Sequence, residues 1–212
     1  MPTTLEDIGG VPHGDKLKAF LTQSFGDEGF PLPLAVPSKS GSIIWTLDPR
    51  LFTAVGAMGA ANDARGSRVI IPRTGTITSL SLFVATASGN VDVGVYSASG
   101  TNRTKIASAG STANAGTNAW QTFAVSAPVN AGDVVDLVCS YDNNTATFAR
   151  LGAAASALCA LPTGYDTDLV GSDVITWAKG SSFPLPGSFA TVNAAAAIGG
   201  TPLLVAKLVP TN

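Results

Sequence analysis

The chain has 212 residues and a formal net charge of −2 at pH 7, with 12% charged and 45% hydrophobic residues. Its lysines and arginines are scattered and form no basic patch, so we expect no direct binding to nucleic acid. No apolar run approaches the roughly 20 residues of a membrane-spanning helix, and the first residues lack the basic and apolar regions of a secretory signal, so we expect neither membrane insertion nor a secretory leader.

Residues 1–40 differ in composition from the rest of the chain and are predicted to form an N-terminal arm. Leu17, Phe20 and Leu21 follow helical spacing, with an aspartate before them and a glycine after them as caps, which predicts one short helix over 15–25. Its apolar stripe is too narrow to form a core of its own. We therefore expect the helix to dock on another surface.

A proline-rich stretch follows this helix and contains the tetrapeptide FPLP at 30–33, which recurs at 183–186. Prolines remove backbone donors and favour an extended path, so this stretch is predicted to lie across a surface as a strap. The two copies could dock into equivalent grooves, on this subunit or on neighbours, or could reflect chance in a chain with 13 prolines. The residues predicted to make the assembly contacts of the arm are Leu17, Phe20, Leu21, Phe30, Pro31, Leu32 and Pro33.

From residue 41 the pattern changes to short strands separated by polar, glycine-rich loops. This rhythm predicts an all-β fold, an antiparallel β-sandwich of jelly-roll type, over 41–212. The strands exceed the eight of a simple jelly roll, so some of them are expected to be C-terminal extensions. The predicted strands are 42–47, 67–73, 77–85, 91–98, 104–111, 119–126, 133–141, 146–152, 156–161, 173–178 and 202–209.

The clearest alternation lies within 78–100, where apolar residues occupy every second position of two runs. The polar turn 87–90 between the runs contains Gly and Asn, which tolerate positive φ, so a β-hairpin is predicted. Gly94 inside the second run indicates a bulge or a close backbone approach. Phe83 and Tyr96 are expected on the outer face, either open to a ligand or covered by a second layer.

Catalytic patterns are largely missing from the sequence. The single histidine lies in the N-terminal region, far from the predicted strands, which argues against a Ser-His-Asp triad. There is no paired Cys-x-x-Cys, no His-Glu-x-x-His and no glycine-rich phosphate-binding motif. Two aspartates could serve a glycosidase, but Asp92 and Asp136 are expected on outer strand faces and the other aspartates mainly in solvated loops. We predict no catalytic residues, no enzyme activity and no cofactor.

Calcium and disulfide sites are the remaining structural options. Hard oxygen ligands could come from Asp142 and Asn143, joined by Asp92 from another segment. The same residue types are ordinary in turns, so no metal is predicted and these three are weak candidates. Cys139 and Cys159 are expected to be reduced, buried thiols, with a disulfide between neighbouring strands as the alternative.

Binding to sugars would require aromatic side chains at the surface. Trp45, Trp120 and Trp177 lie in predicted strands among apolar neighbours, so we expect them to pack in the core or in an interface. Tyr141 and Tyr165 lie beside polar loops and are the better candidates for contact with a ligand.

Residues 68–151 contain four features in order: a G-x-I-x-S-L strand, a G-N-V-D-V-G-V-Y strand, a Gly/Ser/Thr-rich hairpin, and V-x-A-G-D opening a strand. This block resembles β-sandwich domains in virion proteins of tailed bacteriophages, of the minor tail, tail-fibre or head-decoration type. The resemblance implies a structural or host-surface-binding role without fixed catalytic residues. It also implies homo-oligomers, commonly trimers or symmetric rings.

We therefore expect a non-enzymatic structural component of a bacteriophage virion, assembled in the host cytoplasm. Its expected partners are other capsid or tail subunits, further copies of itself with a trimer favoured, and a host surface glycan. Low charge suits a protein whose surface is covered on assembly, although a compact β protein with an uncharged polar surface would have the same composition. The alternatives are a carbohydrate-binding adhesion module of jelly-roll type and, less favoured, a glycan-cleaving enzyme.

Overall fold

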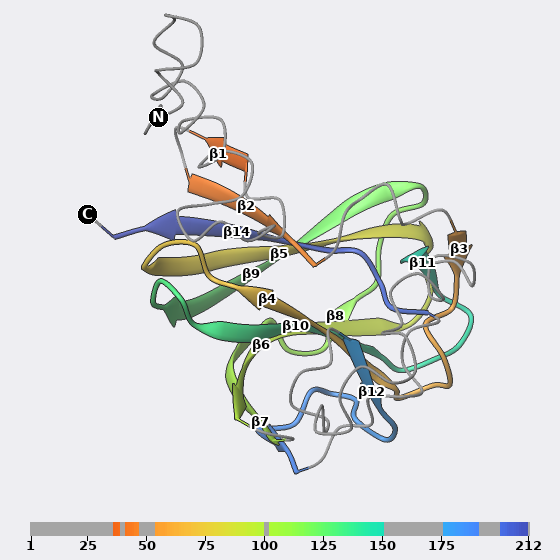
Figure 1. The fold of residues 1–212 in the computed structure, drawn as a ribbon. Coiled ribbons are helices and arrows are strands. Elements are labelled where there is room, and N and C mark those ends of the chain that lie inside the picture. Colours follow the sequence, from red (N-terminus) through yellow and green to blue (C-terminus); the bar gives the residue numbers. More distant parts are fainter. Residues whose placement is uncertain are drawn as a thin grey trace, which may run out of the picture.

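The computed structural model of the protein describes residues 36–38, 41–46, 54–99, 102–150, 176–190 and 200–211. This part of the chain is all-β and contains no helix. Its strands form two antiparallel sheets stacked on each other (Figure 1), an arrangement consistent with a β-sandwich. The helix predicted over 15–25 and the strand predicted over 156–161 lie outside the described residues.

The first sheet consists of β1 (Val36–Ser38), β2 (Gly41–Trp45), β14 (Leu204–Pro210), β5 (Gly75–Thr86), β11 (Thr147–Arg150), β3 (Ala54–Gly56) and β9 (Ala119–Val129). The long strand β5 organises it, because β9 pairs along one side of β5 while β14 and then β11 pair along the other. Within the described residues, β1 pairs only with β2 and forms an edge, where Pro37 is tolerated.

The second sheet consists of β12 (Thr176–Lys179), β4 (Ala64–Ile70), β10 (Val134–Tyr141), β6 (Asn90–Ser99), β7 (Asn102–Ser108), β13 (Ser188–Phe189) and β8 (Thr112–Ala113). The order is β12-β4-β10-β6-β7-β13, with β8 pairing to β6. Every predicted strand that falls on described residues overlaps an observed one, so these predictions are confirmed. The strands that were missed are β1, β3, β8 and β13, which are too short to show alternation.

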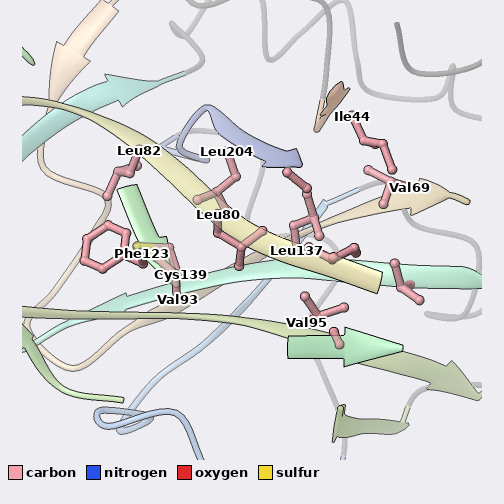
Figure 2. Close-up of a cluster of buried hydrophobic side chains, with 14 of the residues drawn as sticks. Ile44, Val69, Leu80, Leu82, Val93, Val95, Phe123, Leu137, Cys139 and Leu204 are labelled. Atoms are coloured by element: carbon pink, nitrogen blue, oxygen red, sulfur yellow. The ribbon is translucent and has the colours of Figure 1, made fainter. Parts of the chain in front are cut away.

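The hydrophobic core lies between the two sheets and takes alternate residues from each (Figure 2). Leu80 and Leu82 of β5 meet Val93 and Val95 of β6, and all four side chains are fully buried. Burial of a side chain of this size contributes about 1.5–3 kcal/mol. The core therefore explains why apolar residues occupy every second position of these strands.

The hairpin predicted over 78–100 is wrong in its pairing, although both of its strands are present. β5 belongs to the first sheet and β6 to the second, and the turn between them carries the chain across the core. Gly89 in this turn has a φ of 58°, as the turn residues predicted. Alternation reports which face of a strand is buried, and strands that face each other across a core alternate in the same way as strands that pair.

Residues 176–190 pair with the second sheet at its two edges through β12 and β13, and they cover its outer face; we call them the covering segment. A second apolar cluster forms there from Ala64, Tyr96, Val138, Trp177, Leu185 and Phe189. Tyr96 is thus on the outer face but covered, which is one of the two expected outcomes. At Gly94 a Cβ atom would lie 2.9 Å from the Ala107 carbonyl oxygen, so the close backbone approach, one of the two alternatives predicted for this glycine, is confirmed.

Candidate functional site

Tyr141 is not a surface residue, and its predicted role as an exposed ligand contact is wrong. Its side chain is fully buried, and its ring packs edge to face against Phe148 with the ring centroids 5.9 Å apart. Its hydroxyl donates to the Gly59 carbonyl at 2.7 Å. Burial also raises the pKa of the phenol. The residue ends β10 with its side chain directed into the core, which proximity to a polar loop in sequence does not reveal.

The calcium candidates Asp142 and Asn143 form a hydrogen-bonded turn instead of an array of available oxygens. Asp142 accepts from the Asn90 backbone and side chain, both at 2.9 Å, and from the Asn143 amide at 2.6 Å. Burial would raise the pKa of Asp142, but these hydrogen bonds outweigh it and lower the pKa. Asn143 in turn accepts from the backbone N–H groups of Thr145 and Ala146.

The third candidate, Asp92, lies under the covering segment. It is 1% exposed and accepts the Leu185 backbone N–H at 3.0 Å. Across the described ranges, no three His, Cys, Asp or Glu side chains gather where they could hold a metal ion. Hydrogen bonds accepted by these three residues thus hold loops and layers together.

The buried carboxyl group of Asp92 should make the free energy of unfolding depend on pH. Burial raises its pKa, while the Leu185 N–H and nearby Lys105 lower it less strongly; Tyr96 and Cys139 are the other titratable groups close enough to sense its charge. With the pKa raised in the folded state, the contribution of Asp92 to stability is fully present below the ordinary value of 3.8 and is lost as pH rises through the folded pKa.

Asp92→Asn keeps an acceptor for the Leu185 N–H but cannot ionise. We expect this variant to lose the decline in unfolding free energy that Asp92 causes in the wild type as pH rises above the ordinary carboxyl pKa of 3.8. Urea denaturation across this range measures it, with the exposed loop variant Thr117→Asn as control. A decline of unchanged size in Asp92→Asn would show that Asp92 is not its source.

The candidate functional surface is the outer face of the first sheet. Phe83 of β5 pairs with Trp120 of β9, and their rings meet edge to face with centroids 5.6 Å apart. The next pair on the same face of these strands is Ser81 and Thr122, whose hydroxyl oxygens are 2.8 Å apart. Trp120 is 48% exposed, so an aromatic ring and two hydroxyls lie together at the surface.

This surface continues across the sheet through β11 and β3. Phe148 points into the core, so its neighbour Ala149 points outward, and Ala149 pairs with Val55, which is 58% exposed. None of the six residues of this surface carries a charge. We call them the open face: Val55, Ser81, Phe83, Trp120, Thr122 and Ala149. A surface of this kind is typical of contact with another molecule.

Trp120 was expected to pack in the core or in an interface, and the structure excludes the core. Phe123 of the same strand is 3% exposed, so Trp120, three positions earlier, must point the other way in a regular strand. This odd spacing was the signal in the sequence that only one of the two rings could be buried. Trp177 is fully buried, as expected, and Cys139 is a free, fully buried thiol whose pKa burial raises well above its usual value.

Several predicted site residues lie outside the described part of the chain. They are Tyr165, Cys159 and the arm contacts Leu17, Phe20, Leu21, Phe30, Pro31, Leu32 and Pro33. Comparison with known proteins gave no match, either to a family model or to a curated protein. Among the residues that the structure describes, no helix is long and apolar enough to cross a membrane.

Proposed function

We propose that the protein is a non-enzymatic structural component of a bacteriophage virion, in the tail or its fibres or as a capsid decoration protein. Its body would be a jelly-roll-like sandwich that assembles in the host cytoplasm with other virion subunits and further copies of itself. The block 68–151, which resembles phage virion domains, supports this proposal because its strands contribute to both sheets and to their common core.

The observation that carries the proposal is the open face. It presents a half-exposed tryptophan and an exposed valine without a charged group among its six residues, which favours burial against a partner. The buried carboxylates Asp92 and Asp136 accept hydrogen bonds that hold the covering segment on the second sheet. These groups are employed in structure, which fits a protein that acts by contact.

Particles of the phage whose genome encodes this chain test the proposal. Mass spectrometry of gradient-purified particles should detect the chain at a fixed copy number. Deleting residues 1–35, which precede β1, should abolish incorporation while circular dichroism still shows a folded β body. Complete particles that lack the wild-type chain would contradict the proposal.

A carbohydrate-binding module is the second candidate, favoured by one detail of the open face. An exposed indole beside two hydroxyls resembles the combination that stacks on a sugar ring and bonds to its hydroxyls. Glycan-array binding by the purified protein, lost in Trp120→Ala and in Phe83→Ala, would favour this candidate. Tyr141→Ala cannot serve this purpose, because Tyr141 is buried.

Trp120→Ser separates the two candidates. Because the side chain is half exposed, we expect the variant to lose no more than about 1 kcal/mol of stability while contact with its ligand weakens about tenfold. Reduced incorporation into particles without any glycan binding by the wild type supports the structural role. Loss of glycan binding with unchanged incorporation supports the module. Val209→Ser, at an apolar residue of the same sheet that is 37% exposed, is the matched control.

A further inference from the structure

The second FPLP tetrapeptide is bound on the outer face of the second sheet by contacts that centre on one residue. Asp92 accepts the Leu185 backbone N–H at 3.0 Å, and the Lys105 ammonium donates to the Leu185 carbonyl at 2.9 Å. Tyr96 donates its hydroxyl to the Pro186 carbonyl. The Leu185 side chain is 3% exposed, and its Cδ1 lies 3.1 Å from where a Cβ on Gly94 would be.

We call Asp92, Gly94, Tyr96 and Lys105 the FPLP site. The site recognises a leucine side chain together with the backbone of a Leu-Pro pair. Asp92 is buried, and among the described residues its Oδ1 has no hydrogen-bond partner, so the site places a buried acceptor beside the segment that it binds. The flanking prolines contribute little burial, because Pro184 is exposed and Pro186 is half-buried.

The tetrapeptide at 30–33 contains the same four residues in the same order. Aligned with the bound copy, Leu32 matches Leu185 and would supply the N–H, the carbonyl and the buried side chain. Pro33 matches Pro186 and would supply the next carbonyl. Every contact described above uses either the backbone or the leucine side chain of the tetrapeptide. The FPLP site therefore has no means of distinguishing the tetrapeptide at 30–33 from the one at 183–186.

The position of β1 determines which FPLP site the tetrapeptide at 30–33 can reach. Only three peptide links join Pro33 to Val36, where β1 begins, and they span at most about 11 Å. β1 is three strand spacings of about 4.8 Å from β5, and stacked sheets lie about 10 Å apart. The FPLP site lies beyond both, on the far side of the second sheet, and Figure 1 draws β1 and β7 at opposite ends of the molecule. The FPLP site of the same chain is therefore out of reach.

We propose that residues Phe30–Pro33 of one copy bind the FPLP site of a second copy, in place of that copy's Phe183–Pro186. The incoming and outgoing segments are identical, so the exchange costs little in contact energy, as in domain swapping. Each copy offers one segment and one site, which are different surfaces, so the exchange can be reciprocal in a dimer or can run head-to-tail and close a ring such as a trimer. The inference goes beyond the virion proposal and is tested on purified protein.

The direct experiment measures binding of a fluorescent peptide with the sequence of residues 28–36 to the full chain. We expect saturable binding to the wild type and tighter binding to Leu185→Asp, whose own segment competes less. Lys105→Ala should weaken binding several-fold, because it removes the donor to the leucine carbonyl; this variant keeps the test decisive if Leu185→Asp does not fold. No binding to any folded form would overturn the proposal.

Two peptide variants provide a matched pair of controls. The Leu32→Asp peptide should bind at least about tenfold more weakly, because a charge cannot enter the buried leucine position. The Leu34→Asp peptide should bind like the wild type, because position 34 corresponds to the exposed Gly187, which contributes only its carbonyl to the Lys105 N–H. Equal effects of the two changes would show that the peptide binds elsewhere.

The full chain then shows whether the contact builds an oligomer. Light scattering after size-exclusion chromatography should find the wild type self-associated in a concentration-dependent way, and Leu32→Asp shifted to the monomer. Leu34→Asp should remain like the wild type. A wild type that is monomeric at every concentration, or an oligomer that Leu32→Asp leaves intact, would overturn exchange between copies even if the free peptide binds.

Discussion

Asp136→Ala should lower the free energy of unfolding by about 3–5 kcal/mol, the usual cost of removing one partner of a buried ion pair. The Asp136 side chain is fully buried and accepts from Arg103, which is also fully buried. It accepts from the Trp177 indole N–H at 2.7 Å and from Arg68 at 3.4 Å as well. The change removes the negative charge that faces two guanidinium groups and the acceptor that holds the covering segment.

Urea denaturation monitored by circular dichroism measures this loss. Asp136→Asn should fall between the wild type and Asp136→Ala, because it keeps an acceptor for Trp177 but not the charge. Asp133→Ala, in the turn before β10, is the control. Among the described residues its exposed carboxylate accepts from Asn130 alone, so the change should cost about 1 kcal/mol or less. An Asp136→Ala variant as stable as this control would refute the role assigned to the buried cluster.

Gly66→Ala should cost about 3 kcal/mol and detach the covering segment from the second sheet. Gly66 of β4 pairs with Trp177 of β12, and a Cβ at Gly66 would lie 2.2 Å from the Trp177 ring. The ring cannot move aside, because it is fully buried and packs edge to face on Phe189 with centroids 5.0 Å apart. Only a residue without a side chain fits beneath this indole.

Tryptophan fluorescence and thermal unfolding measure the effect, and a red-shifted emission should accompany the loss of stability. Combining Gly66→Ala with Trp177→Leu should cost less than the two single changes added together, because the smaller side chain relieves the collision. Gly187→Ala is the control: a Cβ there meets no atom within 4 Å, so its effect should stay within about 0.5 kcal/mol. Additive effects of Gly66→Ala and Trp177→Leu would contradict direct packing.

The strands were predictable from the sequence, but their partners were not. Alternation in β5 and β6 identified the buried positions correctly, yet the same alternation serves strands that pair and strands that face each other across a core. In the covering segment the sequence predicted only the strand that became β12, because β13 is short and the chain between the two strands is rich in Gly, Ser and Pro. The FPLP repeat was its other visible feature, and only the structure shows what that tetrapeptide contacts.

The candidate surface was harder to predict, because it depends on which side of a strand an aromatic residue occupies. Tyr141 ends an apolar strand and precedes a polar loop, so its position along the chain fits burial and exposure equally well. For Trp120 the spacing to Phe123 contained the answer, but only once β9 was known to be a regular strand with one buried face. Asp92 and Asp136 were expected on outer strand faces, and the layer that buries them could not be predicted.

The central claim of the account is that the open face is a contact surface inside an assembled particle. A photo-cross-linking amino acid placed at position 120, followed by irradiation of purified particles and mass spectrometry, tests it most directly. The account predicts covalent adducts between position 120 and another virion protein chain, with none from position 117 in the exposed loop before β9. Incorporation of the chain into particles without any adduct from position 120 would contradict the claim.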